Sequence, residues 1–237
     1  MSLPPIKNQN LNNYLQKGFN SIEGWCEPVL FHTVDLINSA SINKAGGCCE
    51  IGVHHGKLFI LLNSIVDPNE KSYAIDVFEN QELNIDNSGQ GSKTIFRKNL
   101  DLYDAHKGTN VEIIQGDSTD SALKLESIIK PGSMRIISID GGHTAEHTIN
   151  DLNLAIHMLS NQGIVIIDDI LNPYWLGVIE GVTHFLKGRP TLLPVALGHN
   201  KLYLAKISYR SYYKNLFSNS PLFNRDVQFF GHTVALV

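Results

Sequence analysis

The chain has 237 residues, of which 43% are hydrophobic, and a formal net charge of −4. This length and apolar content suit one large α/β domain over residues 1–237. The sequence has no block of basic residues, so it does not indicate a nucleic-acid-binding face. No apolar stretch reaches the ~18 residues of a membrane span, no signal-peptide core follows Met1, and Cys26, Cys48 and Cys49 lack metal-ligand spacing. We therefore expect a cytoplasmic protein with reduced cysteines and no membrane partner.

The predicted elements alternate along the chain. Residues 1–22 are polar and Asn-rich, and they predict a loosely held N-terminal arm with a short helix. Helix-like apolar spacing follows over residues 23–41. Short apolar runs predict strands at 48–53, 72–77, 111–115, 135–140 and 163–167. The intervening segments predict helices at 57–66, 93–106, 121–129, 144–160 and 174–186.

The C-terminal part departs from this alternation. Residues 191–197 and 202–207 flank a turn at 198–201 and predict an antiparallel hairpin. Residues 208–237 form an aromatic-rich extension that packs either on the domain or on another subunit, so a homo-oligomer is possible. Together the elements predict an α/β fold: a Rossmann-like, doubly wound sheet of five parallel strands plus the hairpin, seven strands in all. Such sheets bind ligands at the carboxyl ends of their strands.

The first predicted strand ends in a glycine-containing turn from Glu50 to Gly56, with glycines at Gly52 and Gly56. Glycine lets a ligand approach the backbone closely, although a glycine-rich turn after any buried strand has a similar pattern. The spacing is acid-x-G-x-x-x-G, and so differs from the dinucleotide fingerprint of nicotinamide-dependent oxidoreductases. It resembles motif I of the class I S-adenosylmethionine-dependent methyltransferases.

The resemblance implies further cofactor contacts at the next strand ends. Asp76 ends the second strand, where these enzymes bind the ribose hydroxyls. Asp117 and Ser118 follow the third strand, where these enzymes contact adenine. Capping of the next helix is an equal alternative for both residues. The predicted cofactor contacts are therefore Glu50, Gly52, Gly56, Asp76, Asp117, Ser118 and Asp140.

Three carboxylates follow the fourth and fifth strands. Asp140 closes one apolar run, and Asp168 and Asp169 close the next. Neighbouring strands lie ~5 Å apart, so these groups converge, and unpaired buried carboxylates are costly. A hard divalent cation such as Mg²⁺ relieves their repulsion, because it prefers oxygen ligands.

The segment from Asp140 to His143, together with Asp168 and Asp169, is similar to the divalent-metal-dependent O-methyltransferases, especially the macrocin and mycinamicin sugar group. This resemblance implies Asp140, Asp168 and Asp169 as metal ligands and His143 as general base. The related catechol-type enzymes carry a lysine at the position of His143 and an amide at that of Asp169, which favours the sugar-type comparison. At the start of a helix, the dipole disfavours a charged imidazole, so we expect a neutral His143.

The sequence thus predicts an S-adenosylmethionine-dependent methyltransferase that methylates a hydroxyl on a small molecule or sugar, with Mg²⁺ as cofactor. The alternatives are a metal-independent methyltransferase and a non-catalytic nucleotide-binding protein of the same fold. Phe78 to Ser92 is polar and rich in Gly, Asn and Asp. We expect this segment to overhang the cofactor edge, either as a closing lid or as a tolerated surface insertion.

Overall fold

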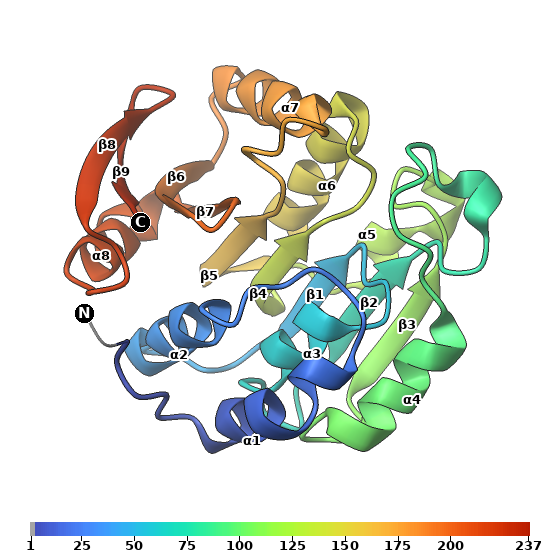
Figure 1. Cartoon of the computed structure of the whole chain (residues 1–237). Helices are drawn as coiled ribbons and strands as arrows, with labels where there is room; N and C mark the ends of the chain where they lie inside the picture. The colour runs from blue at the N-terminus through green and yellow to red at the C-terminus, as the bar shows by residue number, and fades with distance from the viewer. Residues whose placement is uncertain (1–2) are drawn as a thin grey trace.

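The structure, a computed structural model, describes residues 3–237. Within that range one nine-stranded sheet has helices on both faces (Figure 1). The strands are β1 (Gly47–Ile51), β2 (Ser72–Asp76), β3 (Val111–Gln115), β4 (Met134–Ile139), β5 (Leu159–Ile167), β6 (Leu192–Gly198), β7 (Lys201–Lys206), β8 (Arg225–Phe229) and β9 (His232–Leu236). The α-helices are α1 (Gln9–Lys17), α2 (Leu30–Ala40), α3 (Lys57–Asn63), α4 (Lys93–Tyr103), α5 (Leu125–Ile128), α6 (Ala145–Met158), α7 (Leu176–Lys187) and α8 (Ile207–Ser218). Short 3-10 turns are η1 (Phe19–Ser21), η2 (Gln81–Leu83) and η3 (Ser121–Leu123).

The strand order is β3-β2-β1-β4-β5-β7-β6-β9-β8. The first five strands are parallel, and β7 runs antiparallel to both β5 and β6, which confirms the Rossmann-like sheet and its hairpin. The predicted number of seven strands is wrong, because the C-terminal extension adds β9 beside β6 and β8 beside β9. Their hairpin turns at Phe230 and Gly231, both with positive φ. The exposed strand β8 has no continuous apolar run, so it carries a weak strand signal.

Two apolar layers hold the sheet. Helices α1 to α4 and α8 pack on one face, and α5, α6 and α7 pack on the other. Successive strand residues serve opposite layers, as Ile136 and Ile137 of β4 do. Parallel strands buried on both faces require continuous apolar runs, and this is why those runs were recognisable in the sequence.

The N-terminal segment is part of the core, so the expectation of a loosely held arm is wrong. Leu11, Tyr14 and Phe19 are buried against α2 and α3. The Tyr14 hydroxyl donates to the carbonyl of Lys57 at 2.8 Å, and Asp35 accepts from two backbone amides of the segment. The polar residues between these apolar positions concealed a buried helix face.

The C-terminal extension packs on its own domain, where Tyr213 and Phe217 are buried. All three cysteines carry free thiols. Between residues 3 and 237, no helix combines the length and apolarity needed to cross a bilayer.

Strand register aligns the carboxyl ends of the central strands. Ile51 pairs with Ile75 on one side and with Ile139 on the other, and Ile139 pairs with Ile167. The residues that come next, or end the strand, are therefore level with one another: Gly52, Asp76, Asp140 and Asp168. The sheet thus brings the predicted polar residues to one edge.

Candidate active site

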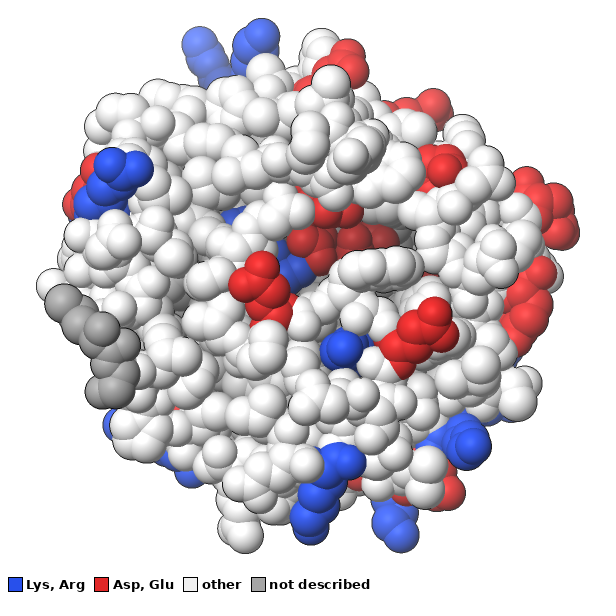
Figure 2. Space-filling view, in the orientation of Figure 1, with Lys and Arg blue, Asp and Glu red and all other residues white. Residues whose placement is uncertain are grey.

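A cavity of about 780 Å³ opens at this edge of the sheet. That volume lies within the range of roughly 300–1,000 Å³ found for small-molecule and cofactor sites. Figure 2 shows acidic side chains, with basic ones beside them, inside the central hollow. The cavity lining includes the predicted residues Gly52, Asp76, Asp117, Ser118, Asp140, His143, Asp168 and Asp169.

Gly52 and Gly56 both have left-handed backbone conformations, with φ of +85° and +86°. A Cβ on Gly52 would fall 1.8 Å from the carbonyl oxygen of Asp140, and one on Gly56 would fall 2.4 Å from the Phe96 ring. Packing within the protein therefore accounts for both glycines. Gly56 faces Phe96 and does not line the cavity, so the close ligand approach expected there is not observed.

Glu50 lies outside the cavity lining, although it was predicted as a cofactor contact. It is 2% exposed, and its Oε2 has no hydrogen-bond partner within the described part of the chain. Burial, with the nearby charge of Asp140, raises the pKa of Glu50 well above its usual value. The side chain therefore lies buried beneath the site, in surroundings that favour its protonated form.

Asp76 links the turns that follow β1 and β2. Its Oδ2 accepts hydrogen bonds from the amides of Val53 at 2.6 Å and His54 at 2.7 Å, and its Oδ1 accepts one from Phe78 at 2.5 Å. A carboxylate has about four acceptor sites, so Asp76 retains acceptor capacity toward the cavity that it lines.

Asp117 accepts from both the amide and the hydroxyl of Thr119 at 2.8 Å. It thereby stabilises the turn before η3, whose N-cap is Asp120. Ser118 uses its carbonyl to accept from Asn150 on α6. The cap of the next helix is Asp120, so the predicted capping by Asp117 or Ser118 is wrong, while both residues line the cavity.

A cluster of three side chains has the geometry of a metal site. Ligand atoms of Asp140, His143 and Asp169 all lie within 4.8 Å of one another. His143 Nε2 is 3.1 Å from Asp169 Oδ2 and 3.8 Å from Asp140 Oδ1. The amides of Asn172 and Asn200 donate to the other oxygen of Asp169, at 2.9 and 2.7 Å, and so orient its Oδ2 toward the cluster.

Asp168 has a different environment from the one predicted. Its Oδ2 forms an ion pair with Nζ of Lys201, a side chain only 4% exposed, and it lies outside the cluster of three. The carboxylates of Asp168 and Asp140 raise the pKa of Lys201, against the lowering effect of burial. The sequence grouped Asp168 with two ligands, but an ammonium group already compensates its charge.

Burial, together with the charge of Asp168, raises the pKa of Asp140 to about 7. Burial alone would lower the pKa of His143, but hydrogen bonds to Asp140, Asp169 and Asp86 raise it to about 11. These contacts favour a charged imidazole, so the neutral His143 expected from the helix dipole is not supported. Helix α6 begins after it, with Thr144 as N-cap, and the three carboxylates outweigh the helix dipole.

Sequence reasoning missed the roles of Asp86, Trp175 and Lys201. Trp175 stacks on the His143 ring, with centroids 4.4 Å apart and planes 15° apart. Lys201 had a usable signal, because the predicted hairpin places β7 beside β5, where Leu202 pairs with Ile167. Asp86 lies in the loop that was expected to overhang the cofactor edge, and no local sequence pattern links it to His143.

The donor set fits a divalent cation. Two carboxylate oxygens and one imidazole nitrogen converge, and such mixed oxygen and nitrogen sets bind divalent metals in proteins. Burial and the neighbouring carboxylates of Asp168 and Asp169 raise the pKa of Asp140, and a cation at Asp140 and Asp169 would offset this negative charge. The His143 ring lies between these carboxylates, with Nε2 directed at both.

Residues 49–170 match the family model described as a methyltransferase domain. A comparison with curated proteins gives no match. Similar solved structures include the O-methyltransferase NovP, which is 19% identical with a TM-score of 0.55, over 76% of this chain and 80% of that chain. The O-methyltransferase from Bacillus cereus in complex with SAH is 17% identical with a TM-score of 0.57, over 85% and 91%. TomG from Streptomyces achromogenes, in complex with SAM, is 16% identical with a TM-score of 0.54, over 84% and 90%.

At these identities the structural likeness establishes the fold, and the family model covers more than half of the chain. The chain therefore belongs to the methyltransferase-domain family, which confirms the S-adenosylmethionine-dependent methyltransferase identified from its sequence.

Proposed function

We propose that the protein transfers the methyl group of S-adenosylmethionine to a hydroxyl oxygen of a small molecule, with a divalent cation held by Asp140 and Asp169. The observation that carries this proposal is the cluster of Asp140, His143 and Asp169 inside the same cavity as Asp76 and the turn after β1. One cavity thus combines the features expected for the cofactor with a histidine and two carboxylates.

The cofactor half of the proposal rests on Asp76 and the strand ends beside it. Bound S-adenosylmethionine supplies an electrophilic methyl group on a sulfonium. Asp76 offers carboxylate oxygens to the ribose hydroxyls, and Asp117 and Ser118 line the cavity beyond the end of β3. Alignment of the acceptor oxygen, methyl and sulfur contributes much of the rate of such a displacement.

The acceptor half rests on His143 and the carboxylates. A divalent cation at Asp140 and Asp169 would lower the pKa of an acceptor hydroxyl. Such a cation would also take up the carboxylate charge that keeps His143 protonated, and a neutral His143 takes the hydroxyl proton at Nε2, the nitrogen that faces the carboxylates. Lys201 keeps Asp168 neutralised, so that the excess negative charge lies on the two proposed ligands.

The cavity wall suggests an acceptor with an apolar body. Trp25, Leu83, Ile85 and Trp175 line the cavity, and Trp25 and Ile85 are 78% and 62% exposed. Exposed apolar side chains that rim a polar floor are typical of small-molecule sites. An acceptor that places a hydroxyl against the carboxylates and an apolar portion against this rim matches both surfaces.

Metal-independent transfer is the second candidate, and Lys201 is the observation that favours it. Lys201 and a protonated His143 already provide two positive charges to the carboxylates. Calorimetry with S-adenosylmethionine, followed by methylation assays on a panel of hydroxyl compounds with chelator or with Mg²⁺, tests both candidates. Activity that disappears with chelator and returns with Mg²⁺ supports the first candidate, and full activity in chelator supports the second. No binding of S-adenosylmethionine would contradict both.

A further inference from the structure

We propose that Asp86 is a positioning residue for His143, and that it reaches His143 only when the loop carrying it is closed over the cavity. We call residues 79–92 the lid loop. The proposal rests on the proposed function in one respect, because it takes His143 as the base.

The contact between Asp86 and His143 joins segments 57 residues apart. Asp86 Oδ2 accepts from the backbone amide of His143 and bonds to its Nδ1, both at 2.7 Å. Its Oδ1 accepts from the amide of Ser88 at 2.9 Å. The Asp86 side chain is only 11% exposed. These hydrogen bonds, strongest among them the pair with His143, lower the pKa of Asp86 against the opposing effect of burial.

This contact determines which nitrogen of His143 faces the chemistry. With Nδ1 engaged by Asp86, only Nε2 is directed at the edge formed by Asp169 and Asp140. Trp175 covers one face of the ring in a stacked arrangement. A partner on one ring nitrogen sets the role of the other, so Asp86 and Trp175 together hold the base in one orientation.

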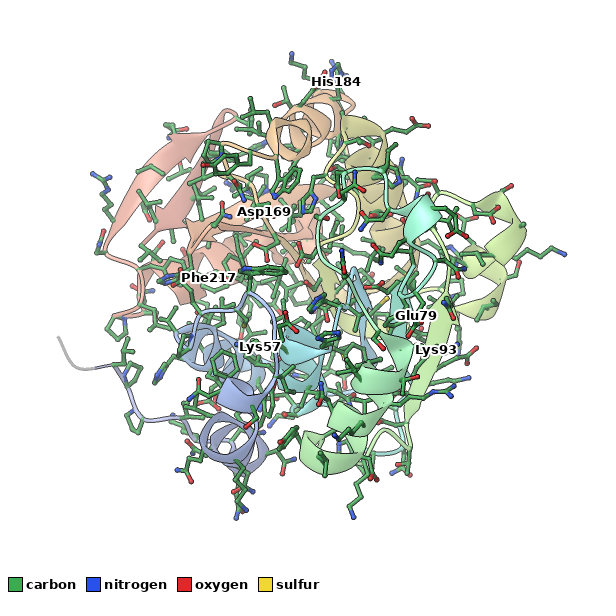
Figure 3. All side chains as sticks on the ribbon, turned by 45° about the vertical axis from the view of Figure 1, so that its right-hand side comes forward. Lys57, Glu79, Lys93, Asp169, His184 and Phe217 are labelled. Carbon is green, nitrogen blue, oxygen red and sulfur yellow. The ribbon has the colours of Figure 1, made fainter. Side chains whose placement is uncertain are left out.

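Hydrogen bonds hold the two ends of the lid loop together. Glu79 Oε1 accepts from the Ser92 hydroxyl and from the Lys93 amide, both at 2.9 Å. Figure 3 shows Glu79 and Lys93 side by side where the loop meets the domain, and Asp169, which lines the cavity, apart from them. The loop leaves β2 through Phe78, which is buried but has a φ of +46°.

The tip of the lid loop is weakly attached. Leu83 and Ile85 are 40% and 62% exposed, so they contribute little packing. The Asn84 side chain donates to the carbonyls of Ser88 and Gly89, which braces the tip internally. Among residues 3–237, the bonds from His143 to Asp86 are the only hydrogen bonds that join residues 80–90 to a segment beyond 77–93.

The contact between Asp86 and His143 therefore has two consequences. When the lid loop closes, Asp86 secures the tip and also binds Nδ1 of the base. When the loop opens, the tip loses its attachment and the ring loses the partner that orients it. Closure and base positioning become a single event, so that the base is fully oriented only in a covered site from which water is excluded.

Three variants test the proposal: Asp86→Ala, Asp86→Asn and Glu82→Gln. Glu82 is exposed on the same loop and its side chain forms no hydrogen bond with any of residues 3–237, so Glu82→Gln is the matched control. Amide hydrogen exchange of residues 80–90 is measured on the free proteins, together with S-adenosylmethionine binding and kcat and KM for the acceptor.

We expect Asp86→Ala to exchange faster across the loop and to lose about 10–100-fold in kcat, the usual cost of removing a group that orients another functional residue. Cofactor affinity should stay within about twofold. Asp86→Asn keeps an acceptor oxygen, so it should restore loop protection but only part of kcat. Glu82→Gln should match the wild type in every measurement.

The proposal is overturned if Asp86→Ala has the same amide hydrogen exchange and the same kcat as the wild type. A loss of kcat that is just as large in a His143→Gln background would also overturn it, because the effect would not act through His143. Hydrogen exchange requires no activity, so it decides the attachment of the loop even if S-adenosylmethionine fails to bind. That failure would contradict the proposed function and not the contact itself.

Discussion

Replacing Lys201 with methionine should destabilise the protein strongly. The Lys201 side chain is 4% exposed and its partner Asp168 is 13% exposed, so both charges of the ion pair are withdrawn from water. Methionine keeps much of the volume but leaves the Asp168 carboxylate without its cation, close to Asp140. Breaking a buried pair by removing one partner costs about 3–5 kcal/mol, a large part of a typical stability of about 5–15 kcal/mol.

Urea unfolding of Lys201→Met, with chelator present, measures this cost. The double variant Lys201→Met/Asp168→Asn should recover most of it, because no unpaired charge remains at that position. The control is Lys71→Met, which removes a surface pair with Glu112 whose side chains are 59% and 35% exposed. Exposed pairs contribute about 0–1 kcal/mol. A cost below about 1 kcal/mol for Lys201→Met, or no recovery in the double variant, would refute the reasoning.

Further predictions concern Asp151, Asp76 and His143. Burial raises the pKa of Asp151 to about 6, and its Oδ2 has no hydrogen-bond partner among the residues that the structure describes. The folded state therefore holds the proton more tightly than the unfolded chain, and it loses stability as pH rises from about 4 through 6. Asp151→Asn should therefore be more stable than the wild type at pH 8, by up to about 3 kcal/mol, with the advantage shrinking toward pH 4; lower stability at both pH values in urea unfolding would contradict this. Asp76→Ala should weaken S-adenosylmethionine binding in calorimetry by about tenfold or more, because it removes acceptors for the ribose hydroxyls and the ties of Asp76 to the turn after β1; unchanged affinity would exclude Asp76 as a cofactor contact. His143→Ala should retain cofactor affinity but lose about 10²–10⁴-fold in kcat, the usual contribution of a general base, and a kcat within a few-fold of the wild type would assign proton removal to another group.

Local patterns in the sequence determined the central sheet. The five parallel strands are short, mostly apolar runs that end in, or are followed directly by, Gly, Asp or Gln, and burial of the central strands on both faces requires such runs. Because parallel strands end at a common edge, the same patterns also brought Asp76, Asp140 and Asp168 to one cavity. Prediction was less successful where polar residues interrupt the apolar positions, as in α1, or where a strand is exposed, as in β8.

Tertiary structure alone decided the partners of these residues. The Asp168–Lys201 pair spans 33 residues and the Asp86–His143 contact spans 57. The first depends on the antiparallel register of β7 against β5, and the second on the path of a polar loop across the cavity. Neither the register nor the path has a local periodicity, since both result from how separate elements pack. The sequence therefore determined which residues reach the strand ends, and the fold decided which charges neutralise one another there.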